Sequence, residues 1–216
     1  QAILVFSAKE PDMNLLLLDR FLMLIENHKV EPIICVSKID LVDIEVIDQL
    51  MKPYKDAGYR VYTLSSKLDQ GVEELKCIFK DRVSVITGQS GVGKSSLLNA
   101  LDIQLNIDTN EISKALGRGK HTTRHVELLK MYGGYVADTP GFSSLELDME
   151  PLDAAHSYHD FAELSDMCKF RGCLHDSEPH CAVKSAVEDG RITKERYEHY
   201  LSFLNETKVL KEKKYD

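Results

Sequence analysis

The sequence predicts an α/β fold in which a mainly parallel sheet, with helices on both faces, precedes a small helical C-terminal domain. Three observations lead to this prediction. Short apolar runs alternate with helix-like segments up to about residue 142. A glycine-rich segment ending in lysine directly follows one of those runs. Beyond Pro151 the pattern becomes helical, and cysteines and histidines gather in one short segment. We therefore expect two domains, an α/β domain at residues 1–147 and a helical zinc-binding domain at residues 148–216.

The predicted elements follow from hydrophobic spacing. We expect strands at residues 2–6, 32–36, 60–64, 83–87 and 135–137. We expect helices at residues 15–25, at 44–54 and from 94 onward, then at 152–164, 182–188 and 194–204. On the last helix, one face carries Tyr197, Tyr200, Leu201 and Leu204. Since parallel strands end at a common edge of the sheet, the loops that follow them are the candidate ligand sites.

The glycine-rich segment fits the phosphate-loop pattern G-x-x-x-x-G-K-[ST] at every position, between a predicted strand and a predicted helix. Lys94 is expected to reach the outer phosphates, and the Ser95 hydroxyl is expected to hold magnesium. The helix N-terminus adds its dipole at the same point. A glycine-rich turn with an exposed lysine is the alternative, but it does not require all four fixed positions. The segment reads Gly88-Gln89-Ser90-Gly91-Val92-Gly93-Lys94-Ser95-Ser96.

A second motif points to guanine. Asp40 can accept hydrogen bonds from guanine N1–H and the 2-amino group, a donor pair that adenine lacks. Lys38 would lie across the ring and brace the phosphate loop, and Ser37 stands where asparagine or threonine is usual. Two loops that follow strands supply this site, Ser37-Lys38-Ile39-Asp40 and, through backbone contacts, Ser65-Ser66-Lys67. The first precedes the phosphate loop by about fifty residues, the reverse of the ordinary order.

A third group of residues is expected to sense the last phosphate. Asp138-Thr139-Pro140-Gly141 follows a short apolar strand, which suits Asp138 to the second shell of magnesium and the Gly141 N–H to the terminal phosphate. Between this segment and the phosphate loop lies a basic stretch, residues 114–124, without helical or strand period. We expect it to be a switch that orders when Thr123, or alternatively Thr122, meets magnesium.

The residue after Gly141 is Phe142, where many GTPases have the glutamine that orients water. His121 lies two residues from Thr123 and is expected to take that role, since imidazole can accept a hydrogen bond near neutral pH. The alternative is a histidine that caps the switch or meets RNA. Lys94, Thr123 and His121 are thus the candidate catalytic residues.

Three of the five cysteines fall within fourteen residues, with histidines interleaved. The spacing Cys-x4-Cys-x-His-x5-Cys suits structural zinc, with Cys168, Cys173, His175 and Cys181 as ligands. His180 competes with His175, which the tighter spacing favours. A disulfide with one spare thiol, or plain buried cysteines, are the alternatives. For Cys35 and Cys77, in apolar surroundings, we expect the core.

Composition narrows the class of protein. A net charge of −8 argues against general affinity for nucleic acid. Basic residues are local, at 114–124 and at 208–214, and each cluster taken alone is more often a solvated face than an RNA footprint. No apolar run approaches the ~20 residues of a membrane span and no signal peptide is visible. We expect a cytoplasmic two-domain enzyme.

Together these segments resemble the RsgA (YjeQ/YloQ) family of circularly permuted GTPases, over essentially all 216 residues. The resemblance is carried by Ser37-Lys38-Ile39-Asp40, by the phosphate loop, by Gly119-Lys120-His121-Thr122-Thr123, by Asp138-Thr139-Pro140-Gly141-Phe142 and by the cysteine–histidine cluster. Family members also carry an N-terminal OB-fold domain that binds RNA. The chain opens on Gln1, directly at a strand. We therefore expect it to be a fragment of a longer protein, and we expect the OB-fold domain to be missing from this fragment.

The resemblance implies a GTP-hydrolysing switch that binds the small ribosomal subunit and its rRNA and assists late maturation of that subunit. It implies GTP or GDP with Mg²⁺ and one Zn²⁺ per chain as cofactors, stimulation by the subunit, and a monomer. The alternative is a guanine-nucleotide-binding adaptor with incidental turnover. An ATPase is a third possibility, which Asp40 disfavours.

Overall fold

The structure is a computed structural model that describes residues 1–102, 128–137 and 145–215. Its contacts divide the chain into two compact units. We call the first the sheet unit (Gln1–Met13, Pro32–Met51 and Arg60–Ser143) and the second the helical unit (Asn14–Glu31, Lys52–Tyr59 and Ser144–Asp216). Each is described by itself. A boundary between domains after residue 147 stays a prediction, since the units group two earlier segments with the C-terminal helices.

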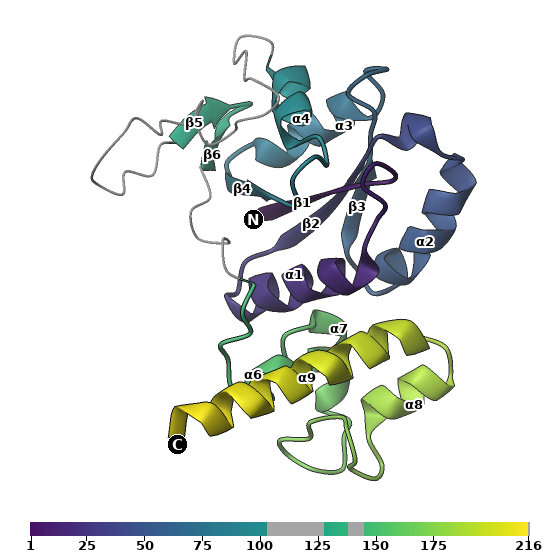
Figure 1. The fold of residues 1–216 in the computed structure, drawn as a ribbon, viewed down its shortest axis with the longest axis vertical. Helices are drawn as coiled ribbons and strands as arrows, with labels where there is room; N and C mark the ends of the chain where they lie inside the picture. The colour runs from purple at the N-terminus through teal and green to yellow at the C-terminus, as the bar shows by residue number, and fades with distance from the viewer. Residues whose placement is uncertain (103–127, 138–144, 216) are drawn as a thin grey trace. The chain divides into compact units, whose positions relative to one another are not determined.

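The sheet unit is built on six strands in the order β3-β2-β1-β4-β6-β5 (Figure 1). Their bounds are β1 Ala2–Ser7, β2 Pro32–Ser37, β3 Arg60–Thr63, β4 Val83–Thr87, β5 Leu128–Met131 and β6 Gly134–Ala137. All neighbours are parallel except β5 and β6. The mainly parallel sheet is as predicted, and the antiparallel edge strand β5 is an addition.

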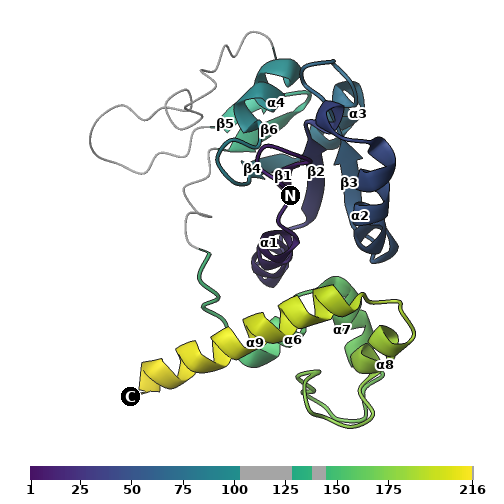
Figure 2. The ribbon, with the colours of Figure 1, turned by 45° about the vertical axis from the view of Figure 1, so that its right-hand side comes forward.

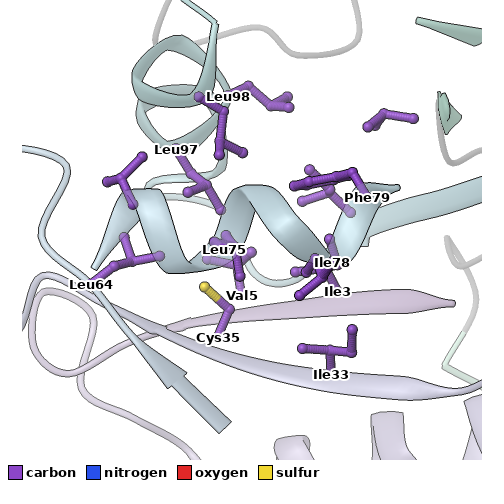
Figure 3. Close-up of a cluster of buried hydrophobic side chains, with 14 of the residues drawn as sticks. Ile3, Val5, Ile33, Cys35, Leu64, Leu75, Ile78, Phe79, Leu97 and Leu98 are labelled. Atoms are coloured by element: carbon purple, nitrogen blue, oxygen red, sulfur yellow. The ribbon is translucent and has the colours of Figure 1, made fainter. Parts of the chain in front are cut away.

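Buried side chains explain why the central strands read as unbroken apolar runs. Ile3, Val5 and Ile33 face helices α3 (Val72–Lys76) and α4 (Lys94–Leu101), which lie side by side (Figures 1 and 2). Figure 3 shows these side chains in one buried cluster with Leu75 and Leu97 from the helices. Residues of the opposite parity, such as Leu4 and Ile34, are fully buried too. Burial on both faces is typical of parallel strands.

Cys77 is a correction. The prediction that it lies in the core is wrong, because Cys77 is exposed, whereas Cys35 is buried as expected. Cys77 opens the short 3-10 helix η2 (Cys77–Phe79), in which Ile78 and Phe79 take the buried positions. The thiol of Cys77 donates to the carbonyl of Glu74 at 3.0 Å.

The helical unit contains α1 (Leu15–Asn27), the end of α2 (Ile44–Asp56), α6 (Pro151–Ala155), α7 (His159–Ser165), α8 (Ala182–Glu188) and α9 (Lys194–Tyr215). Helix α9 packs against α1 and α6, and α7 packs against α8 (Figure 2). The single helix predicted at 152–164 is two helices, because Tyr158 between them is fully buried and its hydroxyl donates to the carbonyl of Asp19 at 3.0 Å. Helix α9 is longer than predicted, and its buried positions are Arg196, Tyr200, Phe203, Leu204 and Thr207.

A buried ionic cluster joins α1, α7 and α9. Arg196 is 3% exposed and donates to Asp160 and, at 3.0 Å, to the hydroxyl of Tyr59. Its Nε lies 3.7 Å from a carboxylate oxygen of Asp19, whose other oxygen meets His199 Nδ1 at 2.6 Å. Burial raises the pKa of Asp19. Sequence patterns give no sign of this cluster, because an arginine in a helix is ordinarily read as exposed.

Within the described residues, none of the helices combines the length and the apolar character that a membrane crossing requires.

Candidate nucleotide site and metal centre

A cavity of about 610 Å³ opens in the sheet unit, a size within the range of small-molecule sites. Three of the predicted nucleotide-binding segments meet there. Its lining residues are Glu10, Ser37, Lys38, Asp40, Leu41, Ser66, Lys67, Gly93, Ser96, Asn99 and Ala100. The strands explain the meeting, because β3, β2, β1 and β4 are consecutive neighbours whose carboxyl ends share one edge.

The carboxylate of Asp40 is held in place at the cavity wall. Ser65 is fully buried, and its hydroxyl donates to Asp40 Oδ1 at 2.6 Å. The backbone N–H of Leu68 donates to the same Ser65 oxygen at 3.2 Å, which fixes the hydroxyl's direction. Sequence reasoning assigned only backbone contacts to the Ser65 loop. The structure adds a side chain that orients the carboxylate predicted to read the base.

Ser37 joins residues 37–40, which we call the base loop, to the phosphate loop. Its Oγ is buried and lies 2.5 Å from the carbonyl of Val92 and 3.2 Å from that of Phe6. A serine therefore makes the link although it is shorter than asparagine. A Cβ on Gly93 would lie 3.8 Å from this Oγ, an ordinary van der Waals contact, so the phosphate loop lies directly beside Ser37. Ile39, the third residue of the loop, is buried, and its N–H donates to the carbonyl of Leu64 at 3.3 Å.

The phosphate loop has the backbone that its glycines predict. Gly88 has φ of 144°, and a Cβ there would lie 2.1 Å from the carbonyl oxygen of Val5, so no other residue fits. Lys94 begins α4, and its Nζ donates to the carbonyls of Gly88 and Gln89 at 2.7 and 2.5 Å. Burial lowers the pKa of Lys94. A phosphate group would offer this ammonium a stronger acceptor than two neutral carbonyls.

The remaining nucleotide-site predictions lie outside the described residues. These are the roles of His121, Thr122, Thr123, Asp138 and Gly141, together with Phe142 and the basic stretch 114–124. They stay predictions.

The structure gathers the four predicted zinc ligands. The donor atoms of Cys168, Cys173, His175 and Cys181 all lie within 4.8 Å of one another. The sulfurs of Cys168 and Cys181 are 3.9 Å apart, and His175 Nδ1 is 3.7 and 3.3 Å from them. Tetrahedral zinc with bonds of about 2.3 Å to sulfur and 2.0 Å to nitrogen would place such pairs at about 3.8 and 3.5 Å. The cluster therefore fits a zinc ion.

Neighbouring groups form hydrogen bonds with this cluster that orient its donor atoms for a cation. His175 Nε2 lies 3.1 Å from Ser165 Oγ, which donates onward to the carbonyl of Phe161 at 2.8 Å. This chain places the ring proton on Nε2 and leaves Nδ1 as a lone pair aimed at the sulfurs. Backbone N–H groups, of His175 to Cys173 and of Ala182 to Cys168, each reach sulfur at 3.4 Å.

Burial sets the electrostatics of the cluster. It lowers the pKa of His175 to about 4, so the ring is neutral at pH 7, as a ligand must be. It raises the pKa of the Cys173 thiol to about 12, a cost that a divalent cation bound to the thiolate would offset. His180 is exposed and is not among the gathered donors.

Comparison with known proteins identifies the family. The family model described as RsgA GTPase matches residues 1–148. A small ribosomal subunit biogenesis GTPase RsgA of Shouchella clausii is 56% identical over 210 residues, which cover 95% of this chain and 72% of that protein. The crystal structure of YloQ, a circularly permuted GTPase, is 46% identical with a TM-score of 0.80, over 97% of this chain and 68% of that one. YjeQ from Thermotoga maritima is 38% identical with a TM-score of 0.78, over 96% and 70%. Both the motifs in their permuted order and these matches lead to one conclusion: the chain belongs to the RsgA family of circularly permuted GTPases.

Proposed function

We propose that this chain hydrolyses GTP as a switch in the maturation of the small ribosomal subunit. Family membership supports the GTPase activity, and the matched relatives are named small ribosomal subunit biogenesis GTPases. The observation that carries the proposal is that one cavity is lined both by Asp40, whose carboxylate Ser65 holds in place, and by residues of the phosphate loop. GTP and GDP, with Mg²⁺, are the ligands that this combination implies.

The described residues support binding at both ends of the nucleotide. Asp40 would accept hydrogen bonds from guanine, and the Ser65 hydroxyl holds the Asp40 carboxylate in a fixed orientation. Lys94 and the N-terminus of α4 would hold the phosphates. Ser95, with Thr123 and Asp138, would hold Mg²⁺, which neutralises the charge that develops during phosphoryl transfer. His121 would position the attacking water.

We further propose one Zn²⁺ per chain at Cys168, Cys173, His175 and Cys181. The fit of the four donor atoms supports it. The ion would cross-link the segment between α7 and α8 of the helical unit, so its binding free energy would become part of that unit's stability.

The small ribosomal subunit is the partner that the relatives' names support. Contact with its rRNA, a monomeric state and a cytoplasmic location are parts of the same proposal. A second candidate, a guanine-nucleotide adaptor with incidental turnover, is favoured by one observation. Phe142 stands where a water-orienting glutamine is common and has no group that could replace it.

One experiment separates these functions. The purified protein is offered labelled GDP in competition with GTP, GDP and ATP, and turnover is then measured with and without small ribosomal subunits. Displacement by guanine nucleotides alone, with turnover that subunits accelerate, supports the switch. In that assay His121→Ala should lower turnover strongly while GTP affinity is kept, the pattern of an interaction made in the transition state. Turnover that stays negligible with subunits present would favour the adaptor.

A further inference from the structure

The turn that follows β1 forms part of the cavity wall, although no sequence motif identifies this turn. It spans residues 7–11, and Glu10 lines the cavity beside Lys38 and Gly93. In the sheet, β1 lies between β2 and β4, so its carboxyl end opens between the base loop and the phosphate loop. The turn is therefore placed where it can contact both loops.

Contacts hold the turn closed and against its neighbours. Ser7 is 1% exposed, and its hydroxyl donates to the carbonyl of Pro11 at 2.6 Å. The N–H of Ala8 donates to the carbonyl of Ser37 at 2.8 Å, which joins the turn to the base loop. A Cβ on Gly91 would lie 3.8 Å from Pro11 Cδ, an ordinary van der Waals contact with the phosphate loop.

The closed turn aims one carbonyl at the base-loop lysine. Lys38 Nζ donates to the backbone oxygen of Glu10. The lysine stem runs along the phosphate loop, since a Cβ on Gly93 would lie 4.0 Å from Lys38 Cε. Glu10 and Lys38 have φ of 59° and 56°, the left-handed region that side chains disfavour. Such conformations persist only where the surroundings impose them, and they gather at ligand sites.

We propose that residues 7–11 are a further nucleotide-binding segment, in which Ser7 positions Lys38 through the carbonyl of Glu10. Ser7 is a positioning residue, because it contacts the turn and leaves contact with the nucleotide to Lys38. Without its hydrogen bond the carbonyl of Glu10 is no longer held, and Lys38 must lose more rotamer freedom when nucleotide binds. Guanine preference should be unaffected, since Asp40 takes no part. The proposal rests on the nucleotide-binding function proposed above.

The test compares two buried serines in the same sheet unit. Ser84, in β4, is fully buried, lies outside the cavity lining and accepts a hydrogen bond from Gln1 at 2.8 Å. Affinity for fluorescent GDP and GTP is measured for Ser7→Ala and Ser84→Ala. Ser7→Ala should weaken both nucleotides about three- to tenfold, the effect of one hydrogen bond. Ser84→Ala should stay within about twofold of the unaltered protein. Equal affinities in the two variants would overturn the proposal.

A double-mutant cycle tests the route through the lysine. In a Lys38→Ala background the effect of Ser7→Ala should fall below about twofold, because the group it positions is gone. A loss undiminished by Lys38→Ala would show that Ser7 supports the cavity in general, and the positioning role would be wrong. Should Ser7→Ala fail to fold, Pro11→Gly loosens the same turn at an exposed position and must show the same dependence on Lys38. Absence of any guanine-nucleotide binding by the unaltered protein would instead refute the proposed function.

Discussion

Replacing Arg196 by methionine should destabilise the helical unit strongly. The guanidinium is almost fully buried, bonds to Asp160 and lies 3.7 Å from Asp19, while the rings of Tyr158 and Tyr59 stand 4.7 and 5.3 Å from its Cζ. Methionine keeps the apolar stem but leaves Asp160 without its cation and Asp19 with His199 alone. Removing one partner of a buried ion pair costs about 3–5 kcal/mol. At about 2–4 °C per kcal/mol for a chain of this length, the midpoint of thermal unfolding should fall by about 6–20 °C.

The matched control is Arg191→Met, at an arginine that also pairs with an aspartate but is exposed. It should change the free energy of unfolding by less than about 0.5 kcal/mol. The chain has no tryptophan, so urea unfolding is followed by circular dichroism. The loss in Arg196→Met should be smaller at pH 5 than at pH 7.5, because carboxylates left without a cation have raised pKa values and are protonated in acid. A loss below about 1 kcal/mol at pH 7.5 would refute the reasoning.

Three further outcomes are expected. Asp40→Asn should weaken GTP binding and admit xanthine nucleotides, since the amide now pairs with a carbonyl; unchanged GTP affinity would mean that the base loop is misplaced. Metal analysis should show that His175→Ala loses zinc and that His180→Ala keeps it. The reverse result would mean that His180, and not His175, is the fourth ligand. The hydrogen bond to Glu26 raises the pKa of His159 in the folded protein. Protonated His159 therefore stabilises the fold fully below the unfolded pKa of about 6.5, and this contribution is lost as pH rises through the folded pKa. His159→Gln should remove that slope from a plot of unfolding free energy against pH, and a slope that persists would point to another group.

Burial decided which elements of the fold were predictable. Strands buried on both faces, such as β1 and β2, leave continuous apolar runs that identify them without further information. Edge strand β5 buries only Met131 and exposes Leu128, so it has neither an apolar run nor an alternating pattern strong enough to notice. The break between α6 and α7 depends on Tyr158 reaching Asp19, a contact 139 positions away in sequence.

The candidate site divides in the same way. The phosphate loop and the cysteine–histidine cluster can be found from the sequence. Their chemistry needs fixed residue types at fixed spacing, and in such short segments the spacing determines which groups can meet. Ser7 and Glu10 have no such spacing. Their role depends on β1 lying between β2 and β4, which is a property of strand order and not of local sequence.

Strand order also explains why the permuted chain can build the site. The base loop follows β2 and the phosphate loop follows β4, and each strand is parallel to β1, so both loops open at one edge whichever is made first. Because β1 lies between β2 and β4, the base loop and the phosphate loop need a link across the end of β1. Ser37 supplies it through its 2.5 Å contact with the carbonyl of Val92, and Lys38 supplies a second through Glu10 on the intervening turn. Gly93 lies beside this link, and its φ of 92° is a backbone conformation that favours glycine. Any residue other than glycine is therefore strained at position 93, and it should be tolerated less well here than a longer side chain at position 37.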